Sequence, residues 1–111
     1  MSGDKPLPPG NGGPDGGKDC ASIIEQVPLN SPKQEVVSKL KIGSILKLEV
    51  HVEGGRDILA AVNSNGQKAG TITTASYITI IKCIQDGFGF DAIVISIDRG
   101  DCMLEIRPES K

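Results

Sequence analysis

The only histidine in this chain of 111 residues is His51, and it stands between Glu49 and Glu53. In a β-strand these three side chains would point to the same face, where they could ligate a metal ion. A second group of ligands does not accompany them in the sequence. We therefore interpret the group as a solvent-exposed face with an ion pair, and we predict no metal site.

The sequence does not support nucleophilic or acid–base catalysis either. Serine is frequent, but no Gly-x-Ser-x-Gly motif is present, and His51 has no evident partner for a hydrolytic triad. The sequence Gly87-Phe88-Gly89 follows a predicted helix, whereas a phosphate-binding loop precedes one. The aspartates fall mostly at predicted turns or strand starts, where carboxylates cap backbone amides: Asp57, Asp86, Asp91, Asp98 and Asp101. We expect neither an enzyme nor a bound cofactor.

The three cysteines, Cys20, Cys83 and Cys102, form an odd set without a Cys-x-x-Cys motif. This pattern is typical of a reducing compartment, and we expect a cytoplasmic protein. Cys83 and Cys102 are predicted to be buried thiols, whereas Cys20 could be exposed. No apolar run approaches the roughly 20 residues of a membrane span, and no signal or lipidation motif is visible, so we expect no membrane association.

The remaining candidate chemistry is the recognition of nucleic acid by cations beside an aromatic ring. Single-strand binding uses aromatic platforms together with Lys and Arg, and the best group here is Tyr77 with Arg56, Lys68 and Lys82. The alternative interpretation is a tyrosine at the edge of the core surrounded by solvated cations. The net charge of −2 and the lack of a long basic run argue against a partner bound mainly through phosphates.

Two predicted strands and a helix would position these residues. The strands Asp57–Val62 and Lys68–Thr73 flank Asn65-Gly66, a pair that tolerates the positive φ angles of a type I′ turn. A main helix is predicted over about 75–86, with Thr73 or Thr74 at its start and Gly87 at its end. The residues with helical spacing that would form its buried face are Tyr77, Ile81, Ile84 and Phe88.

The other elements follow from periodicity and capping signals. A short helix is predicted over about 32–40, because Ser31, Pro32 and Gln34 match a capping box, with Gly43 as its stop. Alternating or continuous apolar residues predict strands over 21–29, 44–53, 90–97 and 102–107. The strand that begins at Asp57 is apolar on both faces, so we expect it to lie in the centre of the sheet.

These elements predict a single α+β domain over residues 20–108. Five or six short strands joined by tight turns, with one or two helices, are typical of a small, partly closed antiparallel β-barrel. The first 19 residues contain six glycines and four prolines, and they lack the apolar surface that would offset the entropy of ordering. We predict that residues 1–19 form a disordered tail.

Part of the chain resembles HIRAN domains. The residues that carry the resemblance are Asp57 to Val62, Asn65 to Ile72, the helix closed by Asp86-Gly87, and Ala92-Ile93-Val94. HIRAN domains are small barrels found alone in bacteria or fused to DNA-remodelling enzymes, and some recognise DNA ends. The resemblance therefore implies a barrel and a DNA ligand. The chain departs from the family in having Glu53-Gly54-Gly55-Arg56 in place of Glu-Pro-x-Asn, and in lacking the aromatic residues that would stack on a DNA end.

Two classes of function follow from these observations. The first is a non-enzymatic domain that binds single-stranded or terminal nucleic acid. The second is a protein–protein interaction module that acts with a partner encoded beside it or self-associates through an edge strand, such as Ser44–Glu53 or Cys102–Arg107. A third hypothesis, a small-molecule or hydrolytic site at the mouth of the barrel, has less support.

Overall fold

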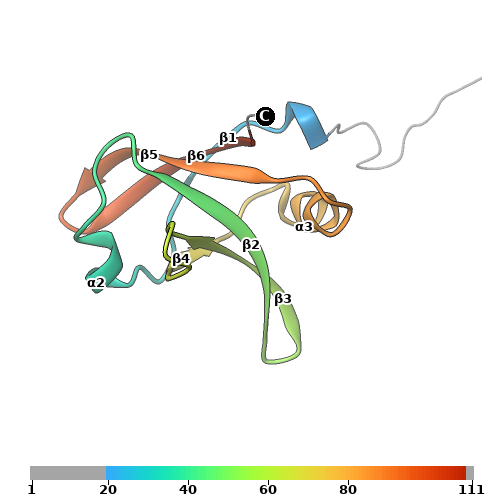
Figure 1. Ribbon diagram of the computed structural model, residues 1–111, viewed down its shortest axis with the longest axis horizontal. Helices are drawn as coiled ribbons and strands as arrows, with labels where there is room; N and C mark the ends of the chain where they lie inside the picture. The colour runs from blue at the N-terminus through green and yellow to red at the C-terminus, as the bar shows by residue number, and fades with distance from the viewer. Residues whose placement is uncertain (1–19, 110–111) are drawn as a thin grey trace, which may run out of the picture.

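A computed structural model describes residues 20–109, which form a small α+β domain with one antiparallel sheet (Figure 1). Its elements are the 3₁₀ helix η2 (Cys20–Ser22), β1 (Glu25–Pro28), α2 (Gln34–Val37), β2 (Ile45–Glu53), β3 (Arg56–Val62), β4 (Lys68–Ile72), α3 (Tyr77–Gln85), β5 (Phe90–Asp98) and β6 (Asp101–Pro108). The tail prediction for residues 1–19 lies outside the described residues. Within the described part of the chain, no helix is long and apolar enough to cross a membrane.

The six strands are ordered β1-β6-β5-β2-β3-β4. The prediction that β3 is a central strand is confirmed. The prediction that β2 and β6 are edge strands is wrong for β6 and for the first part of β2, because each lies between two other strands. The paired strands do not form a closed sheet. One isolated bridge, Asn30 to Thr71, joins the chain after β1 to β4 at the opposite end of the strand order. The sheet is therefore strongly curved but open.

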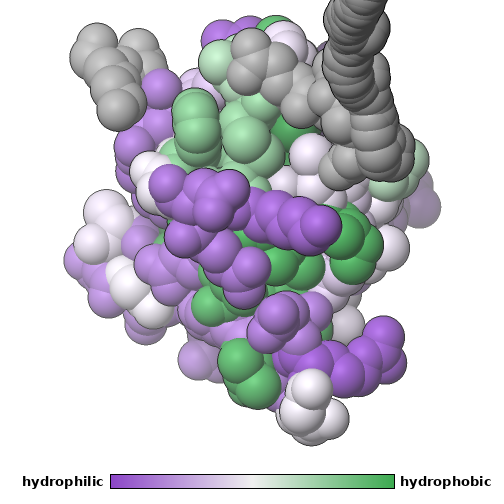
Figure 2. Space-filling model, turned by 90° about the vertical axis from the view of Figure 1, so that its right-hand side faces the viewer, coloured by the Kyte–Doolittle hydropathy of each residue, from purple (hydrophilic) through white to green (hydrophobic). Residues whose placement is uncertain are grey.

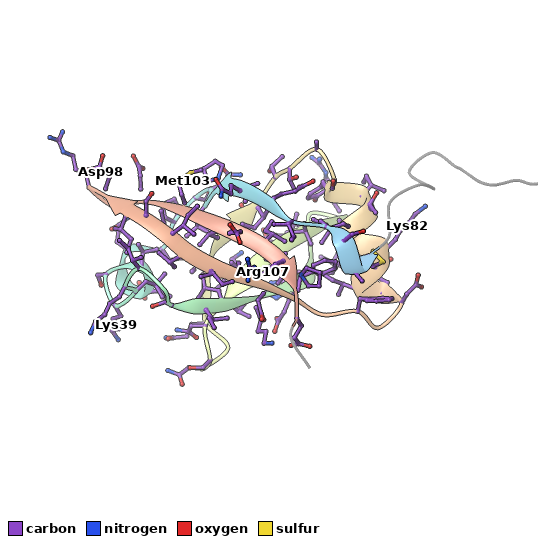
Figure 3. The ribbon with its side chains drawn as sticks, turned by 90° about the horizontal axis from the view of Figure 1, so that it is seen from above. Lys39, Lys82, Asp98, Met103 and Arg107 are labelled. Carbon is purple, nitrogen blue, oxygen red and sulfur yellow. A yellow bond between two sulfur atoms is a disulfide. The ribbon has the colours of Figure 1, made fainter. Side chains whose placement is uncertain are left out.

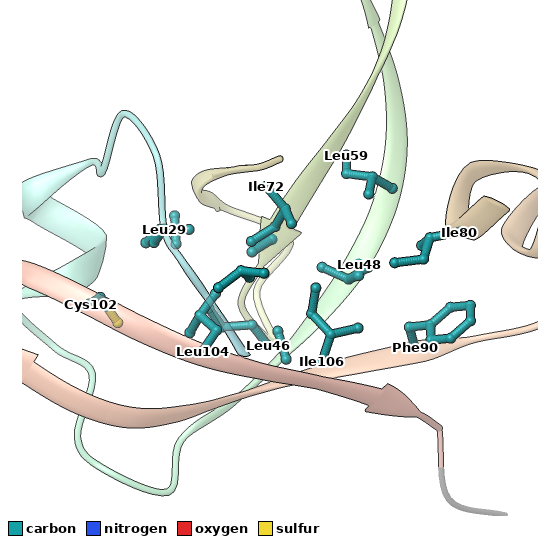
Figure 4. Packing of buried hydrophobic residues seen from close by; sticks show 14 of the residues in the cluster. Leu29, Leu46, Leu48, Leu59, Ile72, Ile80, Phe90, Cys102, Leu104 and Ile106 are labelled. Atoms are coloured by element: carbon teal, nitrogen blue, oxygen red, sulfur yellow. The ribbon is translucent and has the colours of Figure 1, made fainter. Parts of the chain in front are cut away.

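The core lies on the concave side of this sheet (Figure 4). The predicted alternation of β6 is confirmed, because Cys102, Leu104 and Ile106 are all buried. In β2 the buried pattern extends only through Leu46 and Leu48, and Val52 is 70% exposed. Burying one such side chain contributes roughly 1.5–3 kcal/mol, so the second part of β2 gains little from the core.

Helix α3 covers one end of the core with a face that partly matches the predicted one. Ile80, Ile81 and Cys83 are buried, whereas Tyr77 and Ile84 lie at the margin of the core. Phe88 is 46% exposed, because the helix ends at Gln85 and the chain reverses at Gly87, whose φ is 102°. The prediction that Phe88 belongs to the buried face is wrong.

A disulfide bond joins Cys20 to Cys83, with 5.9 Å between their Cα atoms (Figure 3). Cys83 is buried as predicted, but the prediction that it is a free thiol is wrong. The disulfide attaches η2 to α3 and accounts for the orientation of the helix, since Cys83 must face Cys20. Cys102 is a free buried cysteine, and burial raises the pKa of its thiol.

The turns also differ from the predicted types. Gly66 has a φ of 80°, but Asn65 does not adopt a positive φ, so the type I′ prediction is wrong. The side chain of Asn63 stabilises this turn instead, because its Oδ1 accepts hydrogen bonds of 2.9 Å from two backbone N–H groups, those of Asn65 and Gln67. Two consecutive positive φ angles occur in the two-residue turns Gly54-Gly55 and Arg99-Gly100.

Helix α2 has only four residues, fewer than the predicted range of about 32–40. Ser31 has a φ of 48° and Lys33 is the N-cap residue, so the predicted capping box does not form. The chain before α2 is instead attached to β4: Asn30 and Thr71 exchange backbone hydrogen bonds, and the Lys33 N–H donates to the Ala69 carbonyl oxygen. This long-range pairing overrides the local capping preference.

Candidate nucleic-acid interface

Tyr77 occupies the centre of the predicted binding group. It is the first residue of α3, its ring is half-buried against the core, and its hydroxyl donates a hydrogen bond to the backbone carbonyl oxygen of Asp57 in β3. The loop before the helix is fixed by Glu25 of β1, whose carboxylate accepts hydrogen bonds from the hydroxyls of Thr74 and Ser76. The hydrogen bond to Asp57 and the loop attached to Glu25 together fix the position of Tyr77.

The first of two hollows beside Tyr77, which we call the α3 hollow, has a volume of about 370 Å³. Its lining residues come from β3 and α3 and are Arg56, Asp57, Tyr77, Ile78, Ile81, Lys82 and Gln85. Among residues 20–109, neither Arg56 nor Lys82 forms an ion pair. Both cations therefore keep their charge available to an anion in or beside this hollow.

The second hollow, which we call the β4 hollow, lies on the other side of Tyr77 and has a volume of about 560 Å³. Lys68 and Lys33 line it together with Glu53. The Lys68 ammonium lies 2.5 Å from a carboxylate oxygen of Glu53, and this hydrogen bond holds the pKa of Glu53 below its ordinary value. Because Lys68 is already paired, it has less charge to offer than Arg56 or Lys82.

The structure thus brings Arg56, Tyr77 and Lys82 to one hollow and places Lys68 at the other. Sequence reasoning missed Lys33, because long-range backbone hydrogen bonds from Asn30 and Lys33 to β4 bring its segment beside that strand. Figure 2 shows the side of the molecule that carries α3, where hydrophilic side chains form a band with hydrophobic ones between them. Ile78, which is 61% exposed, contributes apolar surface at the α3 hollow.

Several charged groups outside the two hollows are paired with one another. His51 Nε2 lies 2.9 Å from Glu49 Oε1, as the ion-pair interpretation predicts. Lys47 contacts the carboxylates of Asp91 and Glu109, and the hydrogen bond to Glu109, followed by that to Asp91, raises the pKa of Lys47. Within residues 20–109, no three His, Cys, Asp or Glu side chains are grouped closely enough to hold a metal ion.

Comparisons of the chain with family models, with curated proteins and with solved structures gave no match. Function is therefore inferred from the geometry of the surface around Tyr77.

Proposed function

We propose that this domain acts by binding rather than by catalysis, and that its ligand is single-stranded or terminal nucleic acid. The observation that supports this proposal is the pair of cations, Arg56 and Lys82, which lie without carboxylate partners in the described structure around one hollow beside Tyr77. Arg and Lys would contact the phosphates, and the apolar surface of Ile78 with the exposed part of Tyr77 would contact a base.

The expected affinity is modest. Two unpaired cations, with Lys68 as a third, would release about two or three counterions, so the logarithm of the association constant should fall with the logarithm of salt concentration with a slope of about −1.4 to −2.1. Such a small electrostatic contribution agrees with the formal charge of −2. The ligand would therefore be held mainly where base contact and phosphate contact occur together.

A small, partly closed barrel of the HIRAN type is the finer fold hypothesis that accompanies this function. Its support is the all-antiparallel strand order together with the Asn30–Thr71 bridge, which joins the two ends of that order at one point. Some HIRAN domains recognise DNA ends, and the α3 hollow would be the surface that binds nucleic acid here.

The cellular compartment is a separate proposal with two opposing indications. The odd number of cysteines favours the cytoplasm, whereas the Cys20–Cys83 disulfide favours an oxidising compartment. Denaturing lysis of intact cells directly into an alkylating agent, followed by mass spectrometry, decides between them. One alkylated cysteine, Cys102, indicates the disulfide, and three indicate a reducing compartment.

Fluorescence anisotropy with a labelled single-stranded oligonucleotide tests the nucleic-acid proposal. Arg56→Ala and Lys82→Ala should each weaken binding about 5- to 15-fold in low salt, since each removes one charge-assisted phosphate contact. Lys39→Ala is the matched control, because Lys39 lies at the opposite end of the molecule from Lys82 (Figure 3). No binding at tens of micromolar protein, or an equal loss from Lys39→Ala, would contradict the proposal.

A second candidate function is docking of another protein on a sheet edge. It is favoured by one observation, which is that β2 pairs with β5 only over Ile45–Lys47, although it pairs with β3 as far as Glu53. The remaining part of β2 therefore offers one unpaired side, and an added strand can bind such an edge through backbone hydrogen bonds.

A further inference from the structure

The unpaired side of β2 runs from Leu48 to Glu53. The carbonyl oxygen of Ser44 accepts a hydrogen bond of 2.9 Å from the N–H of Val94, on the side of β2 that faces β5. Backbone groups in a strand alternate between its two sides, so the N–H and C=O groups of Leu48, Val50 and Val52 point to that same side. Beyond Lys47, no described strand pairs with β2 there.

This edge differs from the outer edge of β4, which is covered. Asn30 pairs with Thr71, and the Lys33 N–H donates to the Ala69 carbonyl oxygen, so the segment before α2 occupies the β4 edge. Apart from β3, no described strand pairs with β2 over Leu48–Glu53; α3 contacts β2, and the side chain of Val52 is 70% exposed. Natural proteins usually protect an edge of this kind, because it is a template for strand addition.

We propose that a second copy of the chain pairs with this edge in an antiparallel, two-fold symmetric arrangement. The argument for this occupant is charge complementarity. Along one face of β2 the side chains are Glu49, His51 and Glu53, and paired residues in an antiparallel ladder lie on the same face. A two-fold axis at Val50 places His51 opposite Glu49 of the partner subunit. An axis at Val52 places it opposite Glu53 of the partner subunit.

The competing symmetric register is disfavoured by its charges. A two-fold axis at His51 would place Glu49 opposite Glu53 of the partner subunit twice, and like charges directly opposite each other are destabilising. An axis at Glu49 or at Val50 would carry the partner strand into the place where Asp91 of β5 pairs with Lys47, so the axis at Val52 is the favoured one. In this register His51, which contacts Glu49 within its own chain, faces Glu53 of the partner subunit, so His51 is the residue that determines self-recognition.

Analytical ultracentrifugation over a range of concentrations tests this inference. Symmetry repeats each His51–carboxylate pair, so His51→Glu should raise the dimer dissociation constant about two- to thirtyfold, and His51→Lys should lower it at neutral pH. Val52→Pro removes an N–H from the free side without removing a hydrogen bond to β3, and it should abolish the dimer. Far-UV circular dichroism of each variant checks that the fold is unchanged.

Charge reversal then identifies the register. The double variant Glu53→Lys with His51→Glu should restore the dimer, because an axis at Val52 places these two positions opposite each other. The double variant Glu49→Lys with His51→Glu should not restore it. A dimer that neither His51→Glu nor Val52→Pro weakens would overturn the inference.

The proposed dimer rests on the second candidate function, which is docking of a strand on the edge of β2. One experiment can show whether the dimer alone or also the docking is wrong. The probe is a capped peptide with the sequence of Leu48–Glu53, titrated into labelled protein and followed by NMR. A protein that is monomeric at all concentrations but binds the peptide along β2 overturns the dimer and retains the edge function. A monomer that does not bind the peptide overturns both.

Discussion

Removal of the disulfide bond should lower the free energy of unfolding by about 4 kcal/mol. Cys20 and Cys83 are 63 residues apart in the sequence. Closing a loop of this length in the unfolded chain costs about 14 cal/mol/K, which corresponds to about 4 kcal/mol at 25 °C. Cys20→Ser is the appropriate variant, because Cys20 is only partly buried and the buried Cys83 side chain stays in place.

Urea unfolding followed by circular dichroism measures this effect. The Cys20→Ser variant should unfold at a lower urea concentration and with a larger m value, since its unfolded state is less compact and exposes more surface. A reducing agent should bring the oxidised wild type to the stability of the variant and should leave the variant unchanged. That second comparison separates loss of the disulfide from any effect of the serine side chain.

The entropic explanation makes a prediction that can be refuted. If oxidised wild type and Cys20→Ser differ by less than about 1 kcal/mol, closure of this loop does not stabilise the fold as the chain-entropy argument requires. Three reactive thiols in wild-type protein, denatured after purification in air without a reductant, would show that the disulfide itself does not form.

Two further predictions concern the surroundings of the β4 hollow. Gly70→Ala should destabilise the domain by about 2–3 kcal/mol in urea unfolding, because a Cβ at this position would lie 2.6 Å from the Asn30 carbonyl oxygen, and such overpacking forces the backbone to move. Gly66→Ala is the comparison, since its Cβ would meet open space and only the φ of 80° would cost about 1–2 kcal/mol; an equal loss in both variants contradicts the packing argument. Because its hydrogen bond to Lys68 lowers the pKa of Glu53, the pair should stabilise the fold above about pH 4.5, and this contribution should disappear as the pH falls through the lowered pKa. The difference in unfolding free energy between wild type and Lys68→Gln should therefore shrink between pH 7 and pH 3, and a constant difference would contradict this assignment.

Much of the sheet could be predicted because its signals are local. The alternation of Cys102, Leu104 and Ile106 identifies a strand with one buried face, and the structure buries all three. The strand from Asp57 to Val62 has no polar face, which places it between two neighbours, and β3 does lie between β2 and β4. Gly87 ends α3 because its positive φ suits the reversal there.

The errors arise where a distant contact decides the local structure. The Ser31 capping box is lost because Asn30 pairs with Thr71 across the sheet. The face of α3 is set by a bond between Cys83 and a residue 63 positions earlier, and no spacing rule predicts that bond. The type I′ turns lie at Gly54-Gly55 and Arg99-Gly100 because the register of each hairpin leaves two residues to turn the chain.

The sequence predicted which residues form the candidate surface, but it did not predict which of their charges are paired. Arg56 and Tyr77 were predicted to belong to one binding group, and the α3 hollow contains both. The pairing of Lys68 with Glu53 depends on how the tip of the β2–β3 hairpin lies against β4, and this is a tertiary arrangement. Strand pairing alone does not reveal it.

The pairing of β1 with β6 has a consequence for the synthesis of the protein. The first strand of the described domain forms its ladder with the last one, so residues 25–28 cannot pair as a strand until residues 103–106 have been translated. A nascent chain that stops after β5 exposes one side of β5, so premature termination should produce a species that aggregates or is degraded rather than a smaller stable domain.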